Sequence, residues 1–145
     1  ELKKIDNFLL IVTPEARHRA RVLAMQALYQ NHYSSQSLLQ LSEQYKLGNS
    51  HQKVEWPFFD RLLKGTLDNQ KLLDEEISIH LAREFSSTQP VELAILRLAL
   101  FELKNCIEVP YKVVLDEYIE LAKSFGAEEG YQFMKELKCY LISYH

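Results

Sequence analysis

Residues 91–101, VELAILRLALF, contain only two charged side chains, Glu92 and Arg97. As an α-helix, this segment is apolar almost all round, which is typical of a helix buried at the centre of a bundle. The chain has only four Gly and four Pro among 145 residues, too few turn-forming residues for a β-sandwich or barrel. The sequence therefore predicts an all-α fold built around this central helix.

Caps and apolar periodicity predict the other helices. Thr13-Pro14-Glu15 is typical of a helix start, with Thr as N-cap, Pro at the first helical position and an acid in the first turn. Apolar residues at 20, 23, 24, 27 and 28 extend this helix to about Asn31. Further helices are predicted from about 38 to 48, from 56 to 81, from 111 to 125 with Gly126 past its end, and from 128 to about 144. Within 56–81, Gly65 serves either a bend or a close helix contact.

The length suits one domain, because single domains typically run to roughly 100–200 residues. The polar linker 86–90, SSTQP, divides the helical part in two. We expect an irregular N-terminal arm at 1–12 and a helical domain at 13–145, with an N-terminal bundle at 13–85 and a C-terminal bundle at 90–145. Because the first residue is Glu1, we also expect a fragment or a processed chain.

Motifs for catalysis or metal binding are missing from the sequence. The five histidines are scattered without an HExxH pattern, Cys106 and Cys139 form no CxxC pair, and there is no Gly-rich phosphate loop or GxSxG motif. We read the acidic pairs as solvated helix faces or first-turn acids. We therefore expect no catalytic residue, no metal and no cofactor.

The longest apolar run, residues 8–12, has five residues, against the ~20 that a membrane-spanning helix needs. The sequence also has no recognisable secretory signal. We therefore expect no membrane segment, and a cytoplasmic protein with reduced thiols.

Basic residues gather at the first predicted helix, since residues 1–30 hold five Lys or Arg against three Asp or Glu although the whole chain has a net charge of −3. We expect Arg17 and Arg21, one turn apart, to form an exposed rim with His18 beside them, and Arg19 to lie on another exposed face near Gln26. Arginine suits RNA because its planar fork pairs with phosphate and its face stacks on bases. The alternative is a solvated face whose arginines pair with nearby acids, and spacing alone favours that alternative.

A second candidate surface lies near the end of the chain, where Tyr131 and Phe133 stand between Lys123 and Lys135. Aromatic rings beside basic groups can stack on single-stranded nucleic acid. Core packing is the alternative, and from the residues alone it is favoured.

Three blocks of the sequence resemble the NusB family. Residues 20–30, ARVLAMQALYQ, resemble its first-helix signature; 92–103, ELAILRLALFEL, are similar to its central helix; and 109–126, VPYKVVLDEYIELAKSFG, resemble its most recognisable block. The resemblance covers about 17–133 with matching spacing between blocks. It implies a NusB-like all-α fold of two three-helix bundles packed as one domain.

The resemblance also implies a role as an RNA-binding transcription antitermination factor and not as an enzyme. Such a factor binds the single-stranded boxA element of nascent ribosomal RNA together with a small-subunit ribosomal protein, called NusE in this context. It then helps RNA polymerase, within an antitermination complex, to resist termination. Two alternatives stay open: the NusB-like RNA-binding domain of a ribosomal RNA cytosine methyltransferase, and a helical protein–protein adaptor without RNA binding. A homodimer that covers the arginine face is also open.

The family's binding residues map onto particular positions of this chain. The resemblance assigns RNA binding to the arginine-rich helix start and a second RNA lobe to the last helix, and it assigns partner binding to two further residues. The RNA set is Arg17, His18, Arg19, Arg21, Gln26, Glu129, Phe133 and Lys135, and the partner set is Tyr29 and Glu92.

Two departures from the family pattern bear on RNA binding. His18 replaces a family arginine and would be mostly neutral at pH 7, which predicts weaker or pH-sensitive binding. After Phe133, residues 135–138, KELK, replace the family's Asn-Gly-Val-Leu. This exchange removes a small residue suited to close helix contact.

Overall fold

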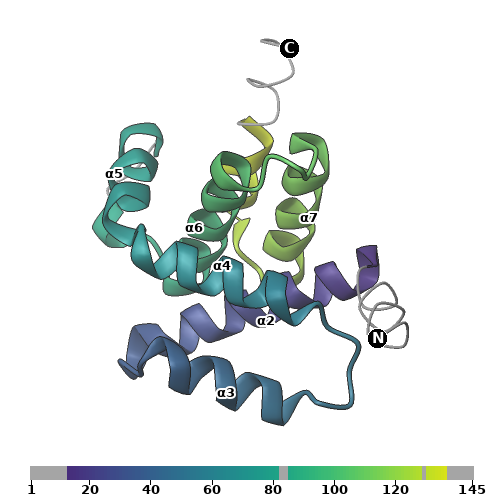
Figure 1. Ribbon diagram of the computed structural model, residues 1–145. Coiled ribbons are helices and arrows are strands. Elements are labelled where there is room, and N and C mark those ends of the chain that lie inside the picture. Colours follow the sequence, from purple (N-terminus) through teal and green to yellow (C-terminus); the bar gives the residue numbers. More distant parts are fainter. Residues whose placement is uncertain (1–12, 82–84, 129, 137–145) are drawn as a thin grey trace. The chain divides into compact units, whose positions relative to one another are not determined.

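The computed structural model describes residues 13–81, 85–128 and 130–136 (Figure 1). All regular secondary structure in these ranges is helical, so the all-α prediction is confirmed. The elements are α2 (Pro14–Tyr33), α3 (Leu38–Gly48), α4 (Trp56–Asp68), α5 (Gln70–His80), the 3-10 helix η1 (Phe85–Ser87), α6 (Pro90–Asn105) and α7 (Tyr111–Ser124). Residues 128 and 130–136 are also helical. The expected arm at 1–12 and the predicted helix beyond 136 lie outside the described residues.

The chain forms two compact units, Glu1–Lys64 and Gly65–His145, whose boundary falls inside α4. The first unit contains α2, α3 and most of α4, and the second contains the end of α4 with α5, α6 and α7. This boundary differs from the linker at 86–90, where the sequence analysis divided the chain. The packing of the two halves as one domain stays a prediction.

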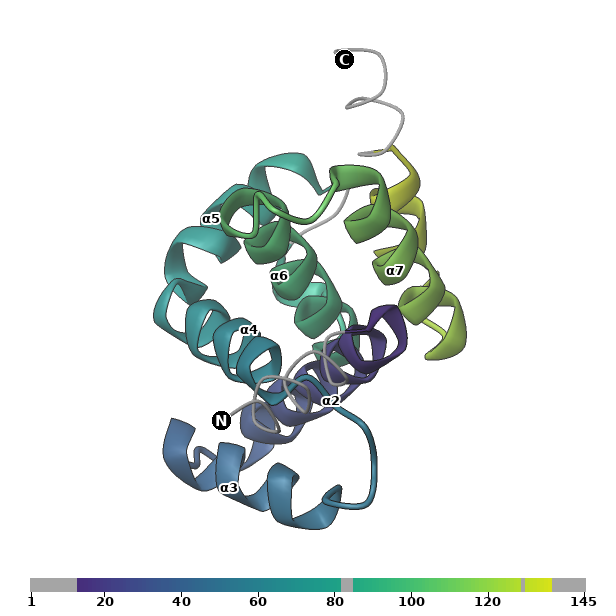
Figure 2. The same cartoon turned by 45° about the vertical axis from the view of Figure 1, so that its right-hand side comes forward.

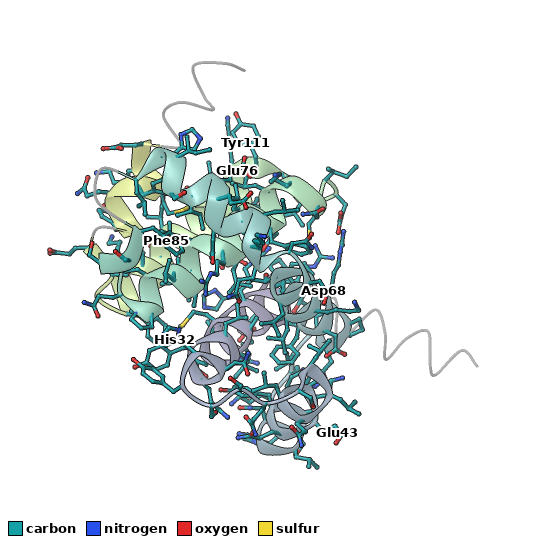
Figure 3. The ribbon with its side chains drawn as sticks, turned by 90° about the vertical axis from the view of Figure 1, so that its left-hand side faces the viewer. His32, Glu43, Asp68, Glu76, Phe85 and Tyr111 are labelled. Carbon is teal, nitrogen blue, oxygen red and sulfur yellow. The ribbon has the colours of Figure 1, made fainter. Side chains whose placement is uncertain are left out.

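In the first unit, α2 and α3 run antiparallel (Figures 1 and 2). The helix starts follow from local caps: the Thr13 hydroxyl accepts a hydrogen bond from the Ala16 amide at 3.0 Å, and Ser37 forms a capping box with Gln40. Between the helices, the Tyr45 hydroxyl donates to the Gln30 side chain at 3.0 Å. Glu43 of α3, labelled in Figure 3, lies on the exposed side of this pair.

The predicted helix 56–81 is interrupted at Asn69, not at Gly65. The Gly65 carbonyl at the end of α4 accepts two hydrogen bonds from Asn69, one from its side-chain amide at 2.8 Å and one from its backbone amide at 3.1 Å. Gly65 instead allows close contact, because a Cβ at this position would lie 2.0 Å from Cζ of Phe101. Of the two roles that the sequence left open for Gly65, the structure supports the close helix contact.

In the second unit, α6 packs against both α5 and α7 (Figures 1 and 2). Its buried residues occupy most of its circumference: Glu92, Leu93, Ala94, Ile95, Leu96, Leu98, Ala99, Phe101 and Glu102. The predicted central buried helix is therefore confirmed for this unit. Polar contacts also connect α6 to both neighbouring helices. Arg97 of α6 donates to both carboxylate oxygens of Asp74 in α5 at 2.6 and 2.9 Å. The Tyr118 hydroxyl of α7 donates to the buried Glu102 carboxylate of α6 at 2.8 Å.

Candidate nucleic-acid interface

The first turns of α2 lie beside the segment that leads into α4, within the first compact unit. The Glu55 amide donates to the Ala16 carbonyl at 3.2 Å, which ties this segment to the backbone of α2. The Lys53 carbonyl accepts from Nη1 of Arg19 at 3.3 Å. The start of α2 is therefore fixed both by its own Thr13 cap and by a neighbouring chain segment.

Arg17 is held on one edge by a carboxylate and lies over an aromatic ring. Its Nε donates to Oε2 of Glu55 at 2.8 Å, and its Nη2 lies 3.5 Å from Oε1 of the same carboxylate. Its Cζ lies 4.7 Å from the centroid of the Phe58 ring, a distance at which a cation is attracted to the ring face. The Arg17 side chain is still 26% exposed.

Arg19 lies on a more open part of the helix start. Its Nη2 donates to Oε1 of Glu15 at 2.7 Å, an i,i+4 pair in which the Glu15 side chain is 73% exposed. Ion pairs this exposed contribute about 0–1 kcal/mol to stability. Arg19 can therefore exchange Glu15 for another anion at little cost.

Arg21 is only 2% exposed, so the prediction that it forms an exposed rim with Arg17 is wrong. Its Cζ lies 5.2 Å from the centroid of the Phe58 ring, which also supports Arg17. The buried face of α2 is wider than the predicted stripe, since it includes 21 and 25 as well as 20, 23, 24, 27 and 28. This wide face places the Arg21 side chain in the interior. Its assignment to RNA binding stays a prediction.

The other predicted residues on α2 are spread along the helix. His18 and Gln26 are half-buried, and Tyr29 is exposed. The Tyr29 and Tyr33 rings meet edge to face with centroids 5.3 Å apart, and a hydrogen bond between them is the main cause that raises the pKa of Tyr33. His32, labelled in Figure 3, also contacts the Tyr33 ring. The exposed end of α2 is thus aromatic, whereas its start is basic.

The remaining predicted residues belong to the second unit. Glu92 is 6% exposed, and its Cγ would lie 3.7 Å from a Cβ added at Gly130. Glu92 is therefore largely covered by other parts of the second unit, and its assignment to partner binding stays a prediction. Phe133 is half-buried, and the exposed Lys135 lies with Nζ 5.2 Å from the Tyr131 ring centroid. Glu129 lies outside the described residues.

We find no metal site in the described part of the chain, because it holds no group of three or more His, Cys, Asp or Glu that could bind an ion. None of the described helices is long and apolar enough to cross a membrane. The described cysteine, Cys106, is a buried thiol. The chemistry that the start of α2 does offer is hydrogen-bond donation and positive charge from Arg17 and Arg19, which suits phosphate.

Comparison with known proteins identifies the family. The model of the NusB family matches residues 18–134. The chain belongs to the NusB family. Transcription antitermination protein NusB of Marinobacter nauticus is 44% identical over 83% of this chain and 77% of its own length. The protein of that name from Pseudoalteromonas translucida is 44% identical over 83% of this chain and 89% of its own, and the one from Legionella pneumophila strain Corby is 41% identical over 81% and 80%.

The NusB family match contains most of the predicted site but not all of it. It begins at His18 and ends at Met134, so Arg17 and Lys135 lie just outside it. Glu55 and Phe58 contact Arg17 in the structure, and neither residue was predicted from the sequence. The only signal in the sequence was an acid just before the helix opening Trp56-Pro57, and such acids occur at many helix starts.

Proposed function

We propose that this chain is a transcription antitermination factor that acts by binding RNA and protein partners and catalyses no reaction. The observation that carries the proposal is its identity of 41–44%, over 81–83% of its length, with proteins named transcription antitermination protein NusB. Its place of action is the cytoplasm, on RNA polymerase within an antitermination complex.

The RNA ligand in this proposal is a single-stranded boxA-type element of nascent ribosomal RNA. Arg17 and Arg19 support it, because both lie at the start of α2 with partly accessible side chains. Arg21 is buried, so we propose that it supports this surface from the interior and does not contact the RNA directly. Gln26 and His18 extend the surface, and the proposal assigns a second RNA-binding lobe to Glu129, Phe133 and Lys135.

The protein partner in this proposal is the small-subunit ribosomal protein called NusE. The exposed Tyr29 ring supports a contact on α2, since aromatic side chains with one polar end are enriched at protein interfaces. Glu92 is buried, so we propose that it contributes to partner binding indirectly, by shaping the surface over α6. Tyr29→Ala is expected to weaken partner binding while RNA binding by the isolated chain stays unchanged; an unaltered partner titration would contradict the Tyr29 contact.

Fluorescence anisotropy tests the proposal directly. Labelled boxA RNA and a scrambled RNA of equal length are titrated with the chain, with and without the ribosomal protein. We expect boxA to bind more tightly than the scrambled strand, and the partner to increase that preference. Removal of one phosphate-binding side chain should make the slope of log K against log salt shallower by about 0.7. Equal affinity for the two RNAs under both conditions would contradict the proposal.

A second candidate function is a helical protein–protein adaptor without RNA binding. One observation favours it: Arg17 and Arg19 already pair with Glu55 and Glu15 of the same chain. The same titration separates the two functions, because an adaptor binds the ribosomal protein and neither RNA. The methyltransferase-domain alternative is less favoured, since the relatives above carry the antitermination name and are covered over 77–89% of their length.

A further inference from the structure

Glu55 and Phe58 both contact the Arg17 guanidinium, and the family resemblance assigns a role to neither. Both belong to the segment that opens α4, and both are buried. Glu55 is anchored through its backbone to Ala16, one residue before Arg17, by the 3.2 Å hydrogen bond described above. The carboxylate and the ring are therefore fixed relative to the helix turn that carries Arg17.

The contacts hold the guanidinium along one edge and one face. Glu55 takes the Nε–Nη2 edge, with the shorter contact at 2.8 Å, and Phe58 takes a face at 4.7 Å. A guanidinium has five N–H donors, and the carboxylate occupies only that edge. The donors on Nη1 belong to the other side of the fork, and the side chain as a whole keeps 26% of its surface exposed.

Such fixation favours binding because a freely rotating arginine side chain loses rotamer entropy when it binds. A guanidinium ordered during folding loses less freedom on meeting a phosphate, which is the general benefit of preorganisation. Arg19 offers a contrast. Its acid, Glu15, is mostly exposed, whereas the Glu55 side chain is only 9% exposed. Of these two arginines, Arg17 therefore has the more rigid acid partner.

We propose that Glu55, assisted by Phe58, is a positioning residue that presents the Arg17 guanidinium to an RNA phosphate. The inference rests on the proposed function. Glu55 acts through Arg17 and makes no RNA contact itself. Its negative charge opposes phosphate binding to some extent, and its hydrogen bond to Nε provides the orientation. The amide of glutamine would keep the second effect and remove the first.

A double-mutant cycle on RNA affinity tests the proposal. The native chain, Arg17→Ala, Glu55→Ala and the double variant are titrated with labelled boxA RNA, and their unfolding is followed in urea. We expect Arg17→Ala and Glu55→Ala each to weaken binding by roughly 3–10-fold. In the Arg17→Ala background, Glu55→Ala should have no further effect on affinity, since the side chain that it positions is gone. A purely structural role would instead weaken both backgrounds equally, and that result would overturn the proposal.

Two further variants separate orientation from charge. Glu55→Gln keeps an acceptor for Nε and should bind RNA at least as tightly as the native chain. Arg17→Lys keeps the charge without the planar fork and should bind about as weakly as Glu55→Ala. Because Arg17 is partly exposed, Arg17→Lys is expected to fold, so the requirement for the planar fork can be tested against the native chain even if Glu55→Ala is unfolded. Native-like binding by Arg17→Lys would overturn the proposal.

Glu15→Ala is the matched control, because it removes one acid from an arginine pair at the same helix start without touching Arg17. We expect its RNA affinity to equal or slightly exceed that of the native chain. Weakening as large as that of Glu55→Ala would overturn the proposal, since loss of either acid would then act alike. Failure of the native chain to bind boxA RNA would overturn the proposed function as well. Intact native binding with a fully active Glu55→Ala variant would overturn the positioning role alone.

Discussion

Helices α2 and α6 open with the same local pattern and end in different environments. Each has Pro at its first position and an acid in its first turn, Glu15 in α2 and Glu92 in α6. Glu15 is exposed and pairs with Arg19, whereas Glu92 is buried. The shared pattern therefore predicts where a helix begins and does not predict what surrounds its first turn.

The N-terminal caps of α2 and α6 also differ, because only α2 has a side-chain cap. Thr13 closes the start of α2 with a hydrogen bond to the Ala16 amide. At α6 the N-cap residue Gln89 makes no side-chain cap, and the hydroxyl of the preceding Thr88 is buried without a hydrogen-bond partner. The Thr13 cap fixes the first turns of α2, which carry Arg17 and Arg19. The start of α6 depends more on packing.

The buried faces of the two helices also differ in side-chain size. In α2 four of the eight buried residues are alanines, whereas α6 buries mainly Leu, Ile and Phe. Small residues let other segments approach the α2 backbone closely, and large residues give α6 more apolar surface to bury. We infer that stability is concentrated in α6 and that α2 serves to position its polar residues.

Ile95→Ala should have the largest effect on stability of the substitutions compared below. Ile95 is fully buried, and deletion of such a side chain lowers the free energy of unfolding by about 2–5 kcal/mol. In α2, Ala24→Gly should cost only about 1–2 kcal/mol, from reduced helix propensity and the removal of one buried methyl. Urea denaturation measures both values. Equal losses of unfolding free energy in the two variants would contradict the inference that stability is concentrated in α6.

Gly65→Ala tests the close contact that supports α6. A Cβ at this position overlaps the Phe101 ring, so the ring or the helix must move, at a cost of about 1–3 kcal/mol. Gly48→Ala is the matched control, because nothing lies within 4 Å of its added Cβ. The control should be neutral or stabilising by up to about 1 kcal/mol. Thermal unfolding of the two variants side by side decides the matter, and a stable Gly65→Ala variant would contradict the close approach.

Thr13→Ala and Thr88→Ala compare the two helix starts directly. Loss of the Thr13 cap should lower stability by about 1 kcal/mol. Thr88→Ala removes a buried hydroxyl that has no hydrogen-bond partner, so relief of its desolvation should offset the removal of its methyl group and leave stability nearly unchanged. The measurement is the midpoint of urea denaturation, compared between variants whose unfolding free energy depends on urea concentration with the same slope. A reversed order of the two effects would contradict the difference in capping.

The smallest expected effect on stability occurs at alkaline pH and concerns the contact between α2 and α3. Burial raises the pKa of Tyr45, whose hydroxyl donates to Gln30. Above the ordinary pKa of about 10, the unfolded chain loses this proton before the folded one, so the contribution of Tyr45 to stability is lost as the pH rises through its raised pKa. Tyr45→Phe should therefore lose melting temperature less steeply than the native chain as the pH rises above about 10. Identical profiles would show that Tyr45 does not contribute.

Local features of the fold could be predicted from the sequence, because their causes lie within a few residues. The Thr13-Pro14 start of α2 and the end of α7 are examples; Gly126 adopts a φ of 70° there, a value that suits glycine. The break at Asn69 was missed, because no Gly or Pro marks it, although the Asn69 side chain donates to the Gly65 carbonyl there. The apolar periodicity of 56–81 predicted one continuous helix across this position.

The candidate site could be predicted only in part. The arginines at the start of α2 are visible in the sequence, but the burial of Arg21 depends on how wide a face other segments cover. Glu55 lies 38 residues from Arg17, and no local pattern pairs two such positions. The burial of Glu92 could not be predicted either, since it depends on the segments that pack around α6, and its assignment to a partner stays a prediction.

The Phe58 ring beneath Arg17 and Arg21 also gives this surface a spectroscopic reporter of its own. Aromatic ring currents shift nearby proton resonances, and the two guanidinium carbons lie 4.7 and 5.2 Å from the same ring centroid. The Nε–H signals of these two arginines should therefore appear displaced from the other arginine signals in a proton–nitrogen NMR spectrum. RNA that engages Arg17 while leaving buried Arg21 in place should move one signal more than the other, so binding can be followed without a dye or a tag.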